Sequence, residues 1–160
     1  MKILKVIALF ILFTPAALSA QDIADHALGL RLGDNDGLGA EISYQKSLNR
    51  YNRLEVNLGW RDTNNFNAFK LAGIYQFVHA IEGNFNWYYG FGGGLGNVDF
   101  KLSDNGGLFV FLAGDIGVEY NFDFPLLLSL DIRPEIGILG YDNFNNNFDF
   151  DIALSIRYQF

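Results

Sequence analysis

Apolar and polar residues alternate along most of the chain after residue 26, with the period of two that is typical of β-strands. The segment from Phe148 to Phe160 is the clearest, because Phe, Ile, Leu and Tyr fill the even positions and Asp, Ser, Arg and Gln most of the odd ones. Turn-forming sequences such as Asp34-Asn35-Asp36-Gly37 separate the alternating segments. The pattern predicts eight strands and leaves no room for a helix. The strands are expected at 27–33, 38–45, 53–61, 67–77, 85–96, 108–121, 126–138 and 148–160.

Alternation alone does not decide which side of a barrel is apolar. A soluble eight-stranded barrel of the lipocalin kind has its apolar face inside, whereas a membrane barrel carries an apolar band outside and a polar interior. In this chain the apolar faces are large and continuous, and the opposite faces mix charges with Gly, Ala and Ser, as a narrow packed interior requires. The sequence therefore predicts an all-β fold, an eight-stranded antiparallel up-and-down transmembrane β-barrel.

Composition supports a β protein and excludes several other classes. The chain has 16 Phe, 8 Tyr and 18 Gly, which favours strands over helices and is too aromatic for a disordered protein. No Cys is present, so neither a disulfide framework nor a cysteine-ligated metal site can form. The net charge of −7 argues against nucleic-acid binding, which needs clustered Lys and Arg.

The first residues have the layout of a secretory signal peptide. Lys2 and Lys5 flank the start of an apolar run that is too short to span a membrane as a helix, and small residues follow it. Cleavage is expected after Ala20, with cleavage after Ser19 as the alternative. The expected organisation is a signal peptide at 1–20 and an outer-membrane barrel domain at 21–160.

Every second strand ends in a related tripeptide. These are Tyr44-Gln45-Lys46, Tyr75-Gln76-Phe77, Tyr120-Asn121-Phe122 and Tyr158-Gln159-Phe160. In each of them the Tyr lies on the apolar face and the amide residue on the opposite face. Aromatic rings collect at the boundary between membrane and water. We therefore expect an aromatic girdle where every second strand leaves the membrane. Its members are Tyr44, Tyr75, Phe77, Tyr120, Phe122 and Tyr158.

The signal peptide, the eight strands and the terminal Arg157-Tyr158-Gln159-Phe160 resemble the small outer-membrane β-barrels of Gram-negative bacteria, of the OmpX and OmpA transmembrane-domain type. The resemblance implies that Tyr158 and Phe160 belong to a C-terminal signal read by the barrel-assembly machinery. It implies a location in the outer membrane and contact with its lipid and lipopolysaccharide. It also implies that both termini lie in the periplasm and that the aromatic girdle is on the periplasmic side. The protein is expected to be a monomer.

By strand phase, eight acidic and six basic residues point into the barrel. An eight-stranded barrel is just wide enough for side chains to fill it, so these charges must largely pair. Arg31 is expected beside Glu41 and Asp151, and Arg133 beside Asp115. The interior is thus read as a structural ion-pair plug, with a narrow ion or proton path as the alternative. The fourteen residues are Arg31, Glu41, Arg53, Glu55, Arg61, Lys70, Asp115, Glu119, Asp131, Arg133, Glu135, Asp149, Asp151 and Arg157.

Two irregular places stand out in the strands. Gly90, Gly92, Gly94 and Gly96 leave a bare inner stripe that makes room for Phe109 and Phe111 or for Lys70, or else mark a bulge at 92–94. Pro134 cannot donate a ladder hydrogen bond, so a bulge is expected there.

Catalysis has little support in the sequence. The two histidines, His26 at the start of a strand and His79 in a predicted turn, have no evident Ser partner, and no metal or cofactor is expected. The favoured function is a non-enzymatic structural or surface-interacting barrel. The alternatives are a small channel or carrier for ions or apolar molecules and, more remotely, an outer-leaflet lipid hydrolase.

Overall fold

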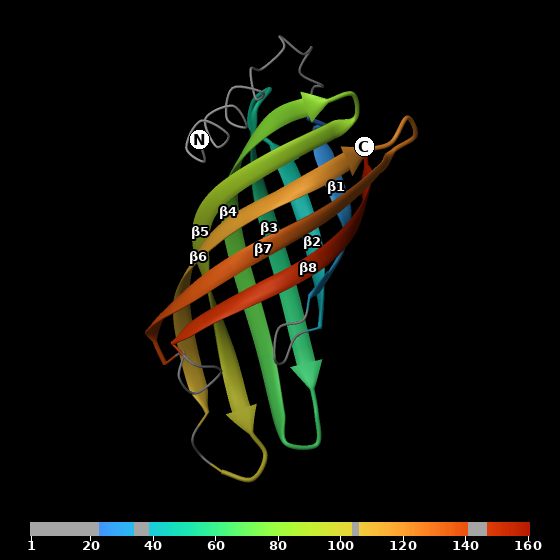
Figure 1. Cartoon of the computed structure of the whole chain (residues 1–160). Helices are drawn as coiled ribbons and strands as arrows, with labels where there is room; N and C mark the ends of the chain where they lie inside the picture. Colours follow the sequence, from blue (N-terminus) through green and yellow to red (C-terminus); the bar gives the residue numbers. More distant parts are fainter. Residues whose placement is uncertain (1–22, 34–38, 104–105, 141–146) are drawn as a thin grey trace, which may run out of the picture.

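The computed structural model is a single closed barrel of eight antiparallel strands, each hydrogen-bonded to its neighbours in sequence and β8 to β1 (Figure 1). It describes residues 23–33, 39–103, 106–140 and 147–160. The predicted signal peptide and the Asp34–Gly37 turn lie outside these ranges. The predicted fold is confirmed. The strands are β1 (His26–Gly33), β2 (Ala40–Ser47), β3 (Asn52–Asp62), β4 (Phe66–Glu82), β5 (Phe85–Phe100), β6 (Gly107–Asn121), β7 (Leu126–Leu139) and β8 (Phe148–Gln159).

The barrel closes where the first strand meets the last. Ala27 is in register with Gln159 and Gly33 with Ala153. At the end of this seam, the His26 amide donates to the Phe160 carbonyl at 3.1 Å, and the Phe160 amide donates to the His26 carbonyl at 2.9 Å. Both ends of the barrel sequence therefore lie at one end of the barrel, called here the terminal end. The opposite end is called the distal end.

The central strands are longer than the sequence predicts. β4 has 17 residues and β5 has 16, against the roughly 9–11 that a tilted strand needs to cross a bilayer. The β3–β4 and β5–β6 hairpins project at the distal end (Figure 1). His79 belongs to β4 and not to a turn, so its predicted position is wrong. A register shift between Ala80 and Glu82 interrupts the alternation there, which explains why the strand end is hard to see in the sequence.

The wall of the barrel has two opposite faces, as the alternation predicts. Along β7, Leu130 and Ile132 are 50% and 41% exposed, whereas Asp131 between them is 2% exposed. The same inversion holds on β8, where Ile152 is exposed and Asp151 is buried. Apolar side chains thus cover the outside, and charged side chains fill the inside. The described residues include no helix of the length and apolar character needed to cross a membrane.

The glycines of β5 give space to two inward phenylalanines. A Cβ on Gly94 would meet the Phe111 ring, and one on Gly96 would meet the Phe109 ring. Both rings are essentially fully buried. The β5–β6 register runs without a shift through Gly92 and Gly94, so the first of the two predicted readings holds and the bulge alternative is wrong.

Pro134 is accommodated without a bulge, which corrects the prediction. The β6–β7 register is the same on both sides of it, with Ala113 opposite Glu135 and Ile116 opposite Ile132. The proline ring instead lies over Gly114, whose Cβ position would be 3.2 Å from Pro134 Cγ. The register shift of this strand pair lies further along, between Val110 and Phe111.

Candidate functional site

The interior of the barrel is the place where chemically active side chains gather. Among the described residues, five basic and seven acidic side chains are at most 4% exposed, and all come from inward positions of the strands. They are Arg31, Arg53, Lys70, Arg133 and Arg157, and Glu41, Glu55, Asp115, Glu119, Asp131, Glu135 and Asp151.

Arg31 of β1 lies among three carboxylates. It donates to Asp131 from Nε at 3.1 Å and from Nη2 at 2.5 Å, and its Nη1 donates to Asp151 and to Glu41, the latter at 3.4 Å. The predicted contacts with Glu41 and Asp151 are both present. Asp131 was not assigned to Arg31 from the sequence, because β7 is separated from β1 by the whole of β8. The long arginine side chain reaches past that strand through the interior.

Arg133 and Arg157 meet at Glu55. Arg133 Nη2 lies 3.0 Å from Glu55 Oε1, and Arg157 Nη2 lies 3.1 Å from Glu55 Oε2. Arg133 also reaches Glu41 at 3.3 Å. The predicted Arg133–Asp115 pair is absent among these contacts, because the guanidinium extends across the interior to β2 and β3 and not along the wall.

In two further ion pairs, the basic side chain also contacts an aromatic ring. Lys70 Nζ lies 2.5 Å and 2.7 Å from the two carboxylate oxygens of Glu135 and 4.9 Å from the centre of the Phe111 ring. Arg53 Nη2 lies 2.7 Å from Glu119 Oε2, and the Arg53 guanidinium stands 4.8 Å from the centre of the Tyr88 ring. Such cation–π contacts are stronger in water-poor surroundings.

Neutral polar residues complete the network. Gln76 accepts from Arg53 Nε at 2.6 Å and donates to Glu55 at 3.1 Å and to Asp115 at 2.5 Å. Gln45 donates to Glu55 at 2.7 Å. The alternation predicts that both glutamines lie on the inner face, but it does not predict their hydrogen bonds to the charged groups. The sequence feature that points to their role is their inward position in the alternation, because a buried amide needs hydrogen-bond partners.

Two predicted interior charges lie at the rim of the barrel. Asp149 is half-buried at the distal end of β8, and one of its oxygens accepts from the amide of Phe150. Arg61 is exposed, and its guanidinium stands 5.8 Å from the centre of the Phe66 ring. Both occupy inward positions in the alternation, but they lie at the distal ends of their strands, beyond the packed interior.

The histidines stand at the terminal end, outside the charged interior. His26 Nδ1 lies 2.6 Å from the Tyr44 hydroxyl, and its ring stacks on Phe160 with centroids 5.4 Å apart. His79 stacks on Trp87 at 4.9 Å. Within the described ranges, no group of three His, Asp or Glu side chains is arranged to hold a metal ion.

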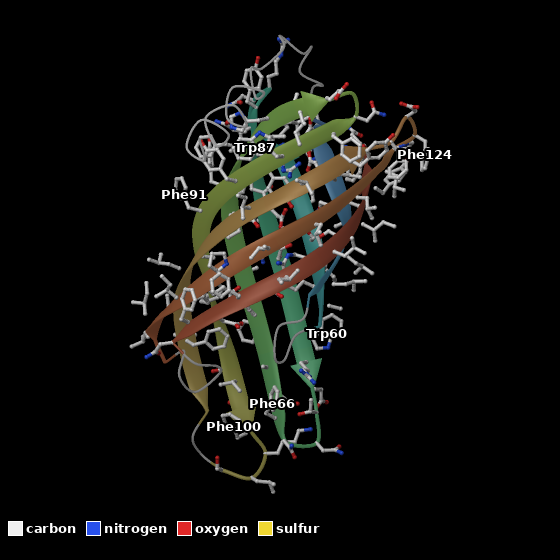
Figure 2. The ribbon with its side chains drawn as sticks, viewed as in Figure 1. Trp60, Phe66, Trp87, Phe91, Phe100 and Phe124 are labelled. Carbon is white, nitrogen blue, oxygen red and sulfur yellow. The ribbon has the colours of Figure 1, made fainter. Side chains whose placement is uncertain are left out.

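Outward aromatic rings cluster at the terminal end (Figure 2). Tyr75 and Phe77 are in contact at 5.1 Å, Phe77 and Tyr89 at 5.1 Å, and Tyr120 and Phe122 at 4.7 Å. Tyr44 and Tyr158 stand opposite Leu28 on either side of β1, in outward positions. The cluster is richer than the six predicted residues. It also includes Phe85, Trp87, Tyr89, Phe91, His26 and His79.

The geometry defines the class of fold: a closed eight-stranded barrel with an apolar exterior, as in the small outer-membrane β-barrels. Among solved structures, the N-terminal β-barrel domain of Pseudomonas aeruginosa OprF is similar with a TM-score of 0.71 and 13% identity, over 88% of this chain and 100% of that one. Neisserial surface protein A has a TM-score of 0.57 and 15% identity, over 86% and 94% of the two chains. Ail, the attachment invasion locus protein of Yersinia pestis, has a TM-score of 0.55 and 13% identity, over 84% and 93%.

At these identities the likeness concerns the fold. No protein family model matches the sequence. No curated protein matches it either.

Proposed function

We propose that the protein is an integral outer-membrane β-barrel without enzymatic activity, whose interior is closed by ion pairs and whose role is structural or surface-interacting. The observation that carries the proposal is the inverted wall, with exposed Leu130 and Ile132 on either side of buried Asp131. A water-soluble barrel has the opposite arrangement. The fold shared with OprF, NspA and Ail supports the same location.

In this proposal the terminal end faces the periplasm and the distal end faces outward. The aromatic cluster at the terminal end then lies at the inner boundary of the membrane, and the projecting hairpins reach out of the outer leaflet. Lipid and lipopolysaccharide surround the wall of a monomer. Tyr158 and Phe160 serve as the signal for the barrel-assembly machinery during insertion.

The location is tested by fractionation followed by an electrophoretic heat-shift assay. The full chain, expressed in a Gram-negative host, is expected in the outer-membrane fraction, with a mobility that changes on boiling because the folded barrel resists detergent. Protein found only in the soluble periplasm, or a band whose mobility does not change, would contradict the proposal.

A small channel is the second candidate function, and the observation that favours it is the set of charged side chains inside the barrel. The two candidates differ in conductance. We expect no reproducible single-channel steps from the purified refolded protein, because ion pairs such as Lys70–Glu135 cross the interior. Regular conductance steps would reject the closed interior and favour the channel.

Lipid hydrolysis is the remote third candidate. The histidines carry the test, since a hydrolase of this kind needs a general base. We expect no lipid-modifying activity in the native protein, and therefore no difference when His26 and His79 are replaced with Gln. An activity that required either residue would overturn the non-enzymatic assignment.

A further inference from the structure

The buried charges of the barrel do not balance. Seven acidic and five basic side chains are buried among the described residues, so the interior would carry two excess negative charges if every group were ionised. A buried charge without a partner is unfavourable by several kcal/mol. The imbalance therefore has to be relieved by something that the ion pairs do not supply.

The ion pairs show where the excess lies. Each base can be matched with one acid, and this matching uses every buried base once. The matched pairs are Lys70–Glu135, Arg53–Glu119, Arg31–Asp131, Arg133–Glu41 and Arg157–Glu55. The two remaining acids are Asp151 and Asp115. Asp151 still shares the Arg31 guanidinium, whereas Asp115 is in no ion pair at all among the described residues.

Asp115 is held only by a neutral amide. Its Oδ2 accepts from Gln76 Nε2 at 2.5 Å, and its Oδ1 is buried without a hydrogen-bond partner. Gln76 donates to Glu55 as well, so ionising Asp115 would place two anions on a single amide. The Tyr88 hydroxyl, on the neighbouring strand β5, is also buried without a partner.

Every element packed around Asp115 contributes to its surroundings. Arg133 is the base that acts most strongly on Asp115, and its guanidinium is already bound to Glu41 and Glu55. On β5, the residue in register with Asp115 is Gly90, which has no side chain that could interact with the carboxyl group. Gln76 on β4 is hydrogen-bonded to Asp115, and the groups that interact with it electrostatically include Glu55 on β3, Tyr88 on β5, and Asp131 and Arg133 on β7.

We propose that the closed interior of the barrel contains a proton-binding site, with Asp115 holding the proton as a neutral carboxylic acid. The proton sits on Oδ1, the oxygen that Gln76 leaves free. Gln76 continues to donate to Oδ2, so no hydrogen bond of the network has to break. The inference concerns the interior alone and holds for either role of the outer surface.

A bound proton makes the packing of the interior dependent on pH. The native barrel keeps a proton that the unfolded chain releases in neutral solution, so the native state loses stability as pH rises. Release of the proton leaves an unpaired anion beside Glu55 and Asp131. The interior then has to take up water or a cation, which loosens the closed plug.

The test uses the full mature chain, refolded in detergent micelles, and the isosteric variant Asp115→Asn. Asp123→Asn is the matched control, because it removes one acid from an exposed turn. Infrared spectroscopy of the native protein in neutral buffer is expected to show the carbonyl band of a protonated carboxyl group. That band is expected to be lost in Asp115→Asn and kept in Asp123→Asn.

A second readout is unfolding in urea between about pH 5 and about pH 9, where an ordinary carboxyl group is already ionised for most of the range. The midpoint of the native protein is expected to fall with rising pH, and that of Asp115→Asn to change less. The infrared measurement on the native protein needs no variant to fold.

Several results would overturn the proposal. One is the absence of a protonated carboxyl band in neutral buffer, and another is a band that survives in Asp115→Asn, which would place the proton elsewhere. A third is an ionised Asp115 with a midpoint raised by sodium or potassium but not by a bulky organic cation at equal ionic strength. That result would assign the site to a metal cation.

Discussion

Arg31 is the side chain whose removal most severely tests the ion-pair interior. In Arg31→Met, the methionine fills part of the volume, but Asp131 and Asp151 lose the one ion-pair partner that each has among the described residues. Glu41 keeps Arg133 at 3.3 Å. Removing one partner of a buried pair destabilises by about 3–5 kcal/mol, so the loss of two pairs predicts a destabilisation of at least about 5 kcal/mol.

Urea unfolding of the refolded protein in micelles measures this loss, with Lys101→Met as the control. Lys101 pairs with Asp62 at 2.7 Å, but their side chains are 41% and 69% exposed. Exposed pairs contribute about 0.2–1 kcal/mol, so the control is expected to unfold close to the native midpoint. Equal midpoints for Arg31→Met and Lys101→Met would refute the reasoning.

The penalty in Arg31→Met is also expected to shrink in acid. The destabilisation comes from the unpaired Asp131 and Asp151 carboxylates, and protonation removes their charge. A buried carboxylate without a cation takes up a proton more readily than an exposed one. The difference in unfolding free energy between the native protein and Arg31→Met therefore narrows as pH falls from neutral toward the ordinary range of carboxyl groups, about 4. A difference that stays constant or widens in acid would show that lost packing, and not unpaired charge, dominates.

Three more changes test the glycine stripe, the outer wall and the C-terminus. Gly94→Ala is expected to lose about 1–3 kcal/mol by overpacking, because its Cβ would meet both the Leu71 backbone carbonyl and the Phe111 ring. Gly73→Ala points into open space and should unfold like the native protein. Similar losses in both variants would contradict the packing described here. On the lipid face, Leu130→Arg is expected to cost about 2–4 kcal/mol near the middle of a bilayer, and a neutral result in refolding titrations would place that position outside the membrane. Deletion of Phe160 removes the backbone bonds to His26 and is expected to lower the heat-shifted fraction in outer membranes, which an unchanged fraction would disprove.

Strand phase could be predicted from the sequence because it depends on one local rule. On β8 every second residue from Phe148 faces outward, and the buried Asp151 and Arg157 occupy the positions between them. In the single sheet that forms a barrel wall, each side chain points either inward or outward. The alternation therefore predicts both the strand and the face on which each residue lies.

The choice of partner inside the barrel could not be predicted in the same way. Asp115 and Arg133 lie on neighbouring strands, and their proximity along the wall suggests a pair. Yet Arg133 binds Glu41 and Glu55 from across the interior. In a narrow barrel the guanidinium reaches several strands, so charge balance and the available space decide the pairing. Neither of these is visible in a linear sequence.

The end of β4 cannot be predicted from the alternation, because a local irregularity interrupts the pattern before the strand ends. The alternation of β4 breaks at the Ala80/Glu82 register shift, so the sequence suggests a turn before the strand has ended. Pro134 gives the opposite error. A missing donor suggests a bulge, but Gly114 opposite it offers space for the ring, and the register continues.

The packing of the barrel also limits where specific recognition can take place. Buried side chains fill the described interior, and the wall presents an apolar surface suited to lipid, so the ends are the surfaces left for a soluble partner. At the distal end, the described residues include contacts within and between two hairpins. Thr63 Oγ1 accepts from the amide of Phe66 at 3.0 Å, Phe66 contacts Phe100 at 6.0 Å, and Lys101 joins the two hairpins through Asp62. The β3–β4 and β5–β6 hairpins therefore contact each other at the distal end, through the Phe66 and Phe100 rings and the exposed Lys101–Asp62 pair (Figure 2). If the proposed surface-interacting role holds, these two hairpins are the part of the described distal end that a soluble partner would meet, because they extend beyond the apolar wall (Figure 1).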